Sequence, residues 1–197
     1  MTESVLLLSG GIDSTALAYS QRPDLAITVD YGQICAEAEI QAATQVCAEL
    51  NIEHTVIEVD CSELGVGSLS NDEQIDVGST PEWWPFRNQL IITLSAMRSV
   101  QKGGEELILG TVKTDQQHAD GKKEFYAMMD SLLSFQEGNL NVSAPAIDLT
   151  TRELIEETET PLSILGWTHS CLESNTPCGE CSGCVNRNNV LNELSDR

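Results

Sequence analysis

The stretch LLLSGGIDSTALAYS, residues 6–20, decides the fold class of this chain. An apolar run over Val5–Ser9, typical of a short buried strand, stops at two glycines, and a helical pattern follows from about Ser14 to Tyr19. A strand, a glycine-rich turn and a helix N-terminus form an anion site, because free backbone N–H groups and the positive end of the helix dipole face one point. The alternative is an ordinary strand-to-helix turn with a good helix cap.

The residues of this turn favour the anion site. Its two glycines let the backbone approach a phosphate that a Cβ atom would obstruct, and Ser9, Ser14 and Thr15 add hydroxyl donors. Asp13 is the unusual member, because a carboxylate beside phosphates needs a cation or a structural partner. The turn has neither the Gly-Lys-Ser/Thr of a Walker A loop nor a G-x-G-x-x-G dinucleotide signature.

The remaining sequence alternates between strand and helix patterns. Further strands are predicted at 25–30, 54–60, 106–110 and within 140–149, and further helices at 36–50, 87–100, 121–135 and 150–157. This alternation predicts an α/β fold with a doubly wound, mostly parallel sheet that helices cover on both faces. Since ligands of such sheets bind beyond the carboxyl ends of the strands, we expect the site at 9–15, 30–33 and 110–120.

Three segments carry more specific signals. Thr150 and Glu153 have the spacing of a capping box. The Gly/Ser-rich segment 65–82 is predicted to be a flexible loop. The helix at 121–135 has an apolar face that comprises Phe125, Met128, Met129, Leu132 and Leu133.

Composition limits the class of protein and its partners. The 197 residues predict one domain, 1–197. Ten basic residues against 31 acidic ones give a formal net charge of −21, which repels phosphate backbones and argues against a nucleic-acid partner. No apolar run is long enough for a membrane span or a signal peptide, so we expect a cytoplasmic protein without a membrane partner. The acidity itself indicates solubility or a high-salt habitat.

Four of the seven cysteines predict a metal site. The motif C-x6-C-x2-C-x2-C supplies the thiolates of Cys171, Cys178, Cys181 and Cys184, within a zinc-binding subregion at 168–187. Tetrahedral Zn²⁺ prefers four such ligands, and a closed set leaves no position for water, so the site is predicted to be structural. An iron–sulfur cluster is the chemical alternative. Unligated thiols are a third interpretation.

Two sets of motifs carry a resemblance to a known family. SGGIDST resembles the pyrophosphate loop of the PP-loop ATP pyrophosphatases, which implies a fold of the adenine-nucleotide α-hydrolase type with ATP and Mg²⁺. VDYGQ (29–33), PFRN (85–88), THSC (168–171) and CGECSGCVNR (178–187) together resemble the QueC-like 7-cyano-7-deazaguanine synthases of queuosine biosynthesis. That resemblance implies ATP-dependent adenylation of the carboxylate of 7-carboxy-7-deazaguanine, with pyrophosphate release, and then reaction with ammonia to the amide and the nitrile.

The resemblance also implies roles for individual residues. The ATP site would comprise Leu8, Ser9, Gly10, Gly11, Asp13, Ser14, Thr15 and Asp30. The substrate site would comprise Tyr31, Gln33, Arg87, Asn88, Gly110, Thr111, Asp115, His118 and Asp120. Catalysis would fall to Asp13, Ser14 and Lys113. Arg87 suits a carboxylate or phosphate, and its alternative is a surface salt bridge. For Lys113 and His118 the alternative is that they are solvated loop groups.

Three features depart from the family pattern. Ile34 and Cys35 replace a basic pair, a Y-P-D-C-R element is missing from 115–123, and Thr151 stands where a lysine is expected. These changes favour an alternative function, in which a divergent enzyme passes the activated acyl group to another amine, including a protein amine in antiviral defence. A non-catalytic nucleotide-binding module and a tRNA-modifying PP-loop enzyme are further alternatives. The candidate oligomeric state is a homodimer.

Overall fold

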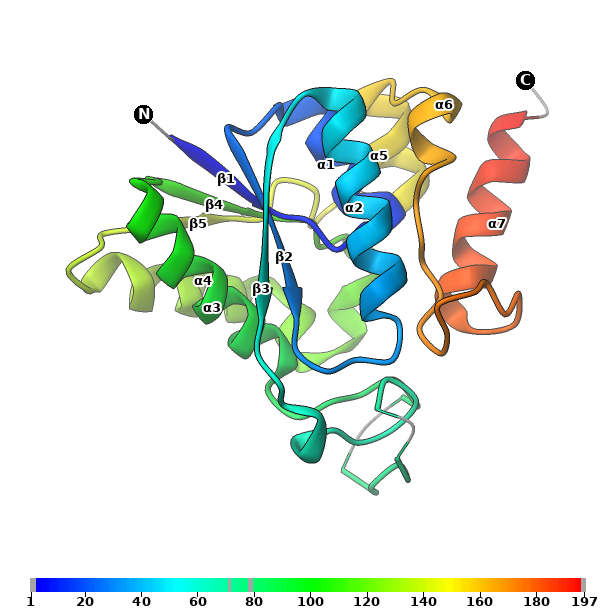
Figure 1. Ribbon diagram of the computed structural model, residues 1–197, viewed down its shortest axis with the longest axis horizontal. Coiled ribbons are helices and arrows are strands. Elements are labelled where there is room, and N and C mark those ends of the chain that lie inside the picture. The colour runs from blue at the N-terminus through cyan, green and yellow to red at the C-terminus, as the bar shows by residue number, and fades with distance from the viewer. Residues whose placement is uncertain (1–2, 71, 78–79, 196–197) are drawn as a thin grey trace.

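The computed structural model describes residues 3–70, 72–77 and 80–195. Its centre is a five-stranded parallel sheet with the order β3-β2-β1-β4-β5 (Figure 1). The strands are β1 Ser4–Leu7, β2 Leu25–Asp30, β3 Glu53–Glu58, β4 Glu106–Leu109 and β5 Asn141–Ser143. All five predicted strands are therefore present. Their ends are shifted by at most two residues, except for β5, which was predicted only within a broad region, and the bounds of β2 match.

Helices cover both faces of this sheet. They are α1 Ile12–Gln21, α2 Ala36–Leu50, α3 Arg87–Lys102, α4 Lys123–Phe135, α5 Thr151–Thr158, α6 Leu162–Leu165 and α7 Ser182–Ser195. Figure 1 shows α1, α2 and α5 on one side of the sheet and α3 and α4 on the other. The doubly wound α/β fold is thus confirmed.

The three central strands, β1, β2 and β4, are mostly apolar because each is buried on both faces. In β1, Val5 belongs to the core beneath α3 and α4, whereas Leu6 belongs to the core beneath α1 and α2. In β2, Ile27 and Ala26 divide between the two cores in the same way. Successive side chains of a strand point to opposite faces, so a strand covered on both sides reads as a continuous apolar run.

Two local predictions from the sequence have different outcomes in the structure. The capping box is confirmed, since Thr150 Oγ1 accepts from the N–H of Glu153 at 3.2 Å and Glu153 Oε2 accepts from the N–H of Thr150 at 2.8 Å. The prediction of the apolar face of α4 is wrong in part. Met128 and Leu132 are 64% and 49% exposed, whereas Tyr126 is buried. The helix has apolar residues on more than one face, so spacing alone selects the wrong stripe.

The order of the strands locates the carboxyl-end crevice. The chain passes from β1 outward to β2 and β3, and then returns to β4 on the other side of β1. Loops that diverge at such a switch point leave a crevice for a ligand between β1 and β4. The chain after β3 extends past this end of the sheet (Figure 1), and Leu69 anchors the predicted 65–82 loop in the core. Residues 71, 78 and 79 of that loop lie outside the described residues.

In the described part of the chain, no helix combines the length and the apolar character that a bilayer crossing requires.

Candidate active site and metal centre

The glycine turn joins β1 to α1 at the switch point. Within the described residues, no side chain caps the first turn of α1, so its backbone N–H groups are available to a ligand. Ser9 Oγ accepts from the N–H of Gly11 at 3.3 Å and lies 3.2 Å from Ser14 Oγ, which donates to the carbonyl of Gly11 at 3.2 Å. The hydroxyls thus brace the turn while the helix end stays open to an anion.

The two glycines of the turn serve different purposes. Gly10 has φ +77°, and a Cβ atom there would lie 2.6 Å from the carbonyl oxygen of Glu39 and 2.9 Å from Ala42 Cβ. A side chain at this position would therefore clash with α2. Gly11 has φ −73°, and the nearest atom to its Cβ would be Ser9 Oγ at 3.3 Å. Gly11 is the position at which a missing side chain leaves room for a phosphate.

The segment after β4 closes the other side of the crevice. A Cβ atom on Gly110 would lie 2.9 Å from Ser14 Cα, so this backbone runs directly against the first turn of α1. Asp115 Oδ2 accepts from the N–H of Val112 at 2.9 Å and from Thr111 Oγ1 at 3.1 Å. The structure therefore brings the predicted residues of the glycine turn and of the 110–115 segment together.

Asp13 is the electrostatically unusual member of the crevice. Burial raises the pKa of Asp13 to about 7, a hydrogen bond with Thr151 opposes this rise, and the nearby charge of Asp115 adds to it. Its Oδ1 atom is buried and has no hydrogen-bond partner among the described residues. A buried carboxylate oxygen without a partner, close to a second carboxylate, fits the oxygen ligands that Mg²⁺ prefers.

A second group of predicted residues lies at the carboxyl end of β2 and the start of α3. Tyr31 is buried and packs edge-on against Trp84, with ring centroids 5.1 Å apart. Burial by itself would lower the pKa of Arg87, but Tyr31, Asp120 and Glu39 together raise it. Arg87 is thus held among anionic and hydroxyl groups inside the site.

Two amide side chains organise the same region. Gln33 Oε1 accepts from the N–H of Tyr31 at 2.9 Å, and its Nε2 donates to Glu39 Oε2 at 2.8 Å and to the carbonyl of Val29 at 3.2 Å. Asn88 Nδ2 donates to the carbonyl of Asp120 at 3.1 Å. Gly32 N–H binds Asp30 Oδ1 at 2.9 Å. The amide of Gln33 already has partners within the chain, whereas its predicted contact with substrate stays a prediction.

Two other predicted residues lie farther out. Lys113 is exposed at the start of a short 3-10 helix, Lys113–Gln117, and its charge acts on Glu153. His118 is half-buried and follows that helix, where its N–H binds the carbonyl of Asp115. Their roles in phosphate binding or proton transfer stay predictions.

Sequence reasoning missed two residues of the site. Burial raises the pKa of Glu39 to about 6, and the Glu39 carboxylate lies among Gln33, Cys35 and Arg87. Burial raises the pKa of Tyr126 to about 12, and the charges of Asp115 and Asp120 add to this. The signal for Glu39 was available, because it lies three residues after buried Ala36 and four before buried Ala43.

Two of the positions that depart from the family pattern are buried in the structure. Cys35 is fully buried and Thr151 is 2% exposed. Burial and the charge of Glu39 raise the pKa of the Cys35 thiol well above its usual range. These two positions therefore present small, uncharged groups to the site, where the pattern of the family has basic residues.

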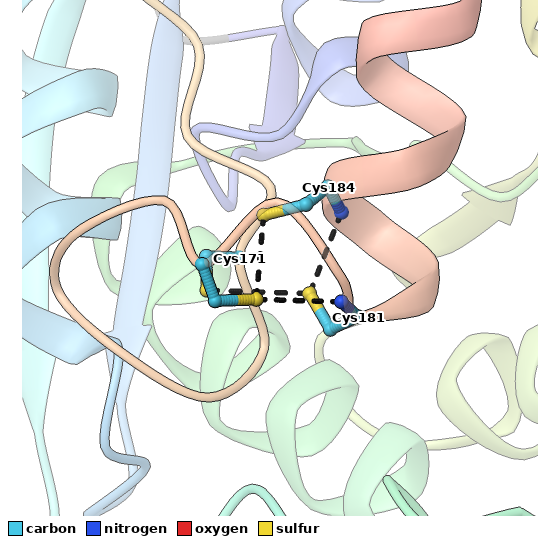
Figure 2. A group of neighbouring side chains, drawn as sticks. Cys171, Cys181 and Cys184 are labelled. Carbon is cyan, nitrogen blue, oxygen red and sulfur yellow. Dashed lines mark hydrogen bonds between the residues drawn. The ribbon is translucent and has the colours of Figure 1, made fainter.

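The four predicted metal ligands converge on one point. Figure 2 shows the side chains of Cys171, Cys181 and Cys184 side by side in this cluster. The Sγ atoms of Cys171, Cys178, Cys181 and Cys184 all lie within 4.8 Å of one another. The distances are 3.9 Å from Cys178 to Cys184 and 4.0 Å from Cys181 to Cys171. Four sulfurs bound to zinc in a tetrahedron at about 2.3 Å lie about 3.8 Å apart. The cluster thus fits Zn²⁺ as a closed, structural site.

Backbone groups support this metal centre. The N–H groups of Cys181 and Glu180 point at Cys178 Sγ from 3.3 and 3.5 Å, and they lower the pKa of Cys178 to about 7. The Cys184 N–H lies 3.4 Å from Cys181 Sγ. Such N–H groups stabilise the thiolates that a metal requires.

The metal centre also borders the glycine turn. The N–H of His169, two residues before the first cysteine ligand, donates to the carbonyl of Gly10 at 2.9 Å. At the other end, Ser182 Oγ lies 3.4 Å from Glu82 Oε1 in the segment before α3. The cysteine cluster therefore ties together two segments that flank the crevice.

Sequence comparison identifies relatives along nearly the whole chain. A family model described as "Queuosine biosynthesis protein QueC" matches residues 3–195. The 7-cyano-7-deazaguanine synthase of Chlorobaculum parvum is 30% identical, over 94% of this chain and 89% of that protein. The 7-cyano-7-deazaguanine synthase of Methanosarcina barkeri is 28% identical, over 94% of this chain and 91% of that protein. The one of Nitratiruptor sp. is 27% identical, over 92% of this chain and 90% of that protein.

Comparison with solved structures supports the fold alone. NMN synthetase from Francisella tularensis gives a TM-score of 0.53 at 16% identity, over 100% of this chain and 78% of that one. A predicted subunit of tRNA methyltransferase from Methanocaldococcus jannaschii gives a TM-score of 0.50 at 16% identity, over 81% of this chain and 74% of that chain. At such low identity these likenesses concern the architecture and say nothing of the substrate.

Proposed function

The chain belongs to the family of the queuosine biosynthesis protein QueC, and from this premise we propose that it activates the carboxylate of 7-carboxy-7-deazaguanine with ATP. A carboxylate oxygen attacks the α-phosphorus of ATP, the bond to the β-phosphate breaks, and pyrophosphate leaves. Ammonia then attacks the acyl carbon, loses a proton, and displaces AMP to give the amide. A second activation at the amide oxygen, followed by loss of AMP and protons, gives 7-cyano-7-deazaguanine.

One observation carries this proposal. The uncapped N-terminus of α1 lies at the switch point of the sheet, beside Gly11 and the unpartnered Oδ1 atom of Asp13. Backbone N–H groups suit the departing pyrophosphate. The Asp13 carboxylate would hold Mg²⁺, which would neutralise phosphate charge, while Ser9 and Ser14 hydroxyls would donate to phosphate oxygens.

The substrate would occupy the neighbouring region. Arg87 would receive the carboxylate of the substrate, because it is the cation that lies between Tyr31, Glu39 and Asp120. A carboxylate such as that of Asp120 would accept two hydrogen bonds from the N1–H and 2-amino edge of the deazaguanine. The cysteine cluster would hold Zn²⁺ in a structural role, outside the reaction.

A second candidate function shares the activation step and differs in the acceptor. Cys35 and Thr151 replace expected basic residues, and both are buried beside the site. Altered residues around the acceptor favour transfer of the acyl group to another amine, including an amine of a partner protein. The homodimer also stays a prediction.

Isotope exchange between ATP and pyrophosphate tests the activation step. We expect exchange that depends on 7-carboxy-7-deazaguanine and does not occur with 7-deazaguanine, which lacks the carboxylate. The mass of the product, with and without ammonia, then separates nitrile formation from transfer to another amine. A folded, zinc-loaded protein that shows no exchange with this acid would overturn the proposal.

A matched set of glycine variants tests where the pyrophosphate binds. Gly11→Ala would add a methyl group 3.3 Å from Ser9 Oγ, where the phosphate would approach the turn, so we expect loss of exchange with a stability change of about 1 kcal/mol at most. Gly103→Ala is the control, since Gly103 ends α3 at φ +81° with nothing within 4 Å of its Cβ position. It should lose about 1 kcal/mol of stability and keep full exchange. Equal exchange in both variants would contradict binding at Gly11.

A further inference from the structure

Glu39 is a half-buried acid that the reaction described above does not use. It lies in the first turn of α2, on the helix face that also carries the buried residues Ala36 and Ala43. Its backbone carbonyl packs against Gly10 of the glycine turn, 2.6 Å from the place of a Cβ atom. Acidic side chains are rarely buried unless they have partners. The groups around the Glu39 carboxylate therefore determine how this charge is stabilised.

Two contacts of the Glu39 carboxylate reach the predicted substrate residues. Its Oε2 accepts a hydrogen bond from Gln33 Nε2 at 2.8 Å, and Gln33 in turn holds the N–H of Tyr31 at 2.9 Å. Its charge is one of three that raise the pKa of Arg87. Glu39 thus acts on Gln33, after β2, through a hydrogen bond, and on Arg87, at the start of α3, through its charge.

The surroundings of Glu39 show how this charge is balanced. Burial raises its pKa to about 6, the Gln33 and Cys35 side chains and the Arg87 guanidinium oppose this rise, and Asp30 adds to it. Among these groups Arg87 is the cation. An arginine that faces acids stays in place without a ligand, and it can turn toward an anionic ligand that outcompetes them.

We propose that Glu39 is a positioning residue: its hydrogen bond fixes Gln33, and its charge, which lies beyond direct ion-pair distance of Arg87, attracts the guanidinium toward the arrangement that receives the anionic group of the acid substrate. This inference rests on the proposed function, since it assigns Arg87 to that substrate. Glu39 itself would touch neither ATP nor the reacting carboxylate. Its effect would therefore appear in the KM for the acid and leave the KM for ATP unchanged.

Glu37 provides a matched control on the same helix turn. It is exposed, two residues from Glu39, and its Oε1 accepts from Gln41 Nε2 at 3.2 Å. Glu37→Gln and Glu39→Gln remove the same charge from the same helix end. Glu39→Gln also keeps an oxygen that can accept the hydrogen bond from Gln33, so this substitution isolates the charge of Glu39.

Kinetics of acid-dependent ATP–pyrophosphate exchange give the first test. Relative to Glu37→Gln, we expect Glu39→Gln to lower kcat/KM for the acid by about tenfold or more, through KM. The ratio between the two variants should be large near about pH 8 and approach one below about pH 6, where Glu39 of the control is itself protonated. Equal kinetics in both variants at all pH values would overturn the proposal.

A double-mutant cycle separates failure of this inference from failure of the proposed function. Urea unfolding of Glu39→Gln, Arg87→Gln and the double variant measures the coupling of the two side chains without any substrate. We expect the unfolding constants to deviate from additivity by at least about twofold. If the wild type shows no exchange, the proposed function fails and the cycle still decides whether Glu39 holds Arg87. An additive cycle, with normal exchange in Glu39→Gln, would refute the role of Glu39.

Discussion

At the scale of single residues, Asp13 combines a functional position with a cost to folding. Burial raises the pKa of Asp13 to about 7 from its ordinary value of 3.8. The folded chain therefore binds this proton more tightly than the unfolded chain does. Stability consequently falls as the pH rises between these two values, and the full penalty is present above about pH 7.

Replacement of Asp13 by asparagine removes the stability cost of the buried charge together with the carboxylate proposed to hold Mg²⁺. We expect Asp13→Asn to be more stable than the wild type by about 1–3 kcal/mol near pH 8, with a gain that shrinks below pH 7. The same variant should lose ATP–pyrophosphate exchange, because the carboxylate that would hold Mg²⁺ is gone. Urea denaturation at several pH values and the exchange assay measure the two effects.

Asp24→Asn is the control with the opposite sign. Asp24 is exposed, and hydrogen bonds from the N–H groups of Ser4 and Glu3 lower its pKa. Its contribution to stability is present above the ordinary pKa and is lost as the pH falls through the lowered value. This variant should be slightly less stable than the wild type at neutral pH and fully active. A stability loss in Asp13→Asn near pH 8 would contradict the argument for Asp13.

Residues of the site differ in how far the sequence could predict them. Ser9 and Ser14 belong to one contiguous turn, so a local pattern was sufficient to place them at the crevice. Glu39 and Tyr126 enter the site from helices whose side chains were expected to face solvent or core. Their place depends on how α2 and α4 pack against the sheet, which the helical pattern does not specify.

At the scale of elements, the local patterns predicted the sheet and most helices. The bounds of β2 and α2 match the expectation, because an apolar run between turns and a long amphipathic segment are strong local signals. Helices α6 and α7 were missed. The first is a single turn, and the second starts inside the cysteine motif, with Cys184 and Val190 as the buried apolar residues among its described side chains. The cysteine cluster and tertiary contacts position α7 more than its own pattern does.

The metal centre should therefore control the anchoring of α7. Cys181 and Cys184 lie at its start, and Arg187 Nε donates to Thr168 Oγ1 at 2.7 Å, which joins α7 to the segment before the cluster. We expect one zinc per chain. Removal of zinc with a chelator should free α7 and the 168–181 segment, because a closed zinc site contributes folding energy directly. Hydrogen exchange of these backbone amides, before and after chelation, measures the effect.

Matched cysteine variants separate metal loss from thiol loss. Cys178 is the exposed ligand, so Cys178→Ser disturbs packing least while it removes one thiolate. We expect loss of zinc and faster exchange in α7. Cys61→Ser, at a half-buried thiol remote in sequence from the cluster, should keep both zinc and protection. An iron–sulfur absorbance band in the purified wild type would show that the metal prediction is wrong.

At the scale of the whole molecule, charge repulsion opposes the fold. The net charge is −21. Ion pairs join the bases Lys102, Lys123 and Arg152 to acidic side chains. These pairs are exposed at the surface, where such contacts contribute little. Most acidic side chains therefore repel one another across the surface without local compensation.

Salt should stabilise this protein through screening. The Debye length falls from about 10 Å at about 0.1 M salt to about 3 Å at about 1 M, so repulsion between separated surface acids weakens strongly. We expect the thermal midpoint to rise steadily over this range in KCl, by about 2–4 °C for each 1 kcal/mol of relieved repulsion. Calorimetry measures the shift. Sucrose of equal osmolality is the control, because it strengthens burial by exclusion and leaves the charges unscreened. If sucrose and KCl raise the midpoint equally, or KCl lowers it, then repulsion between the acids does not limit the stability of the fold.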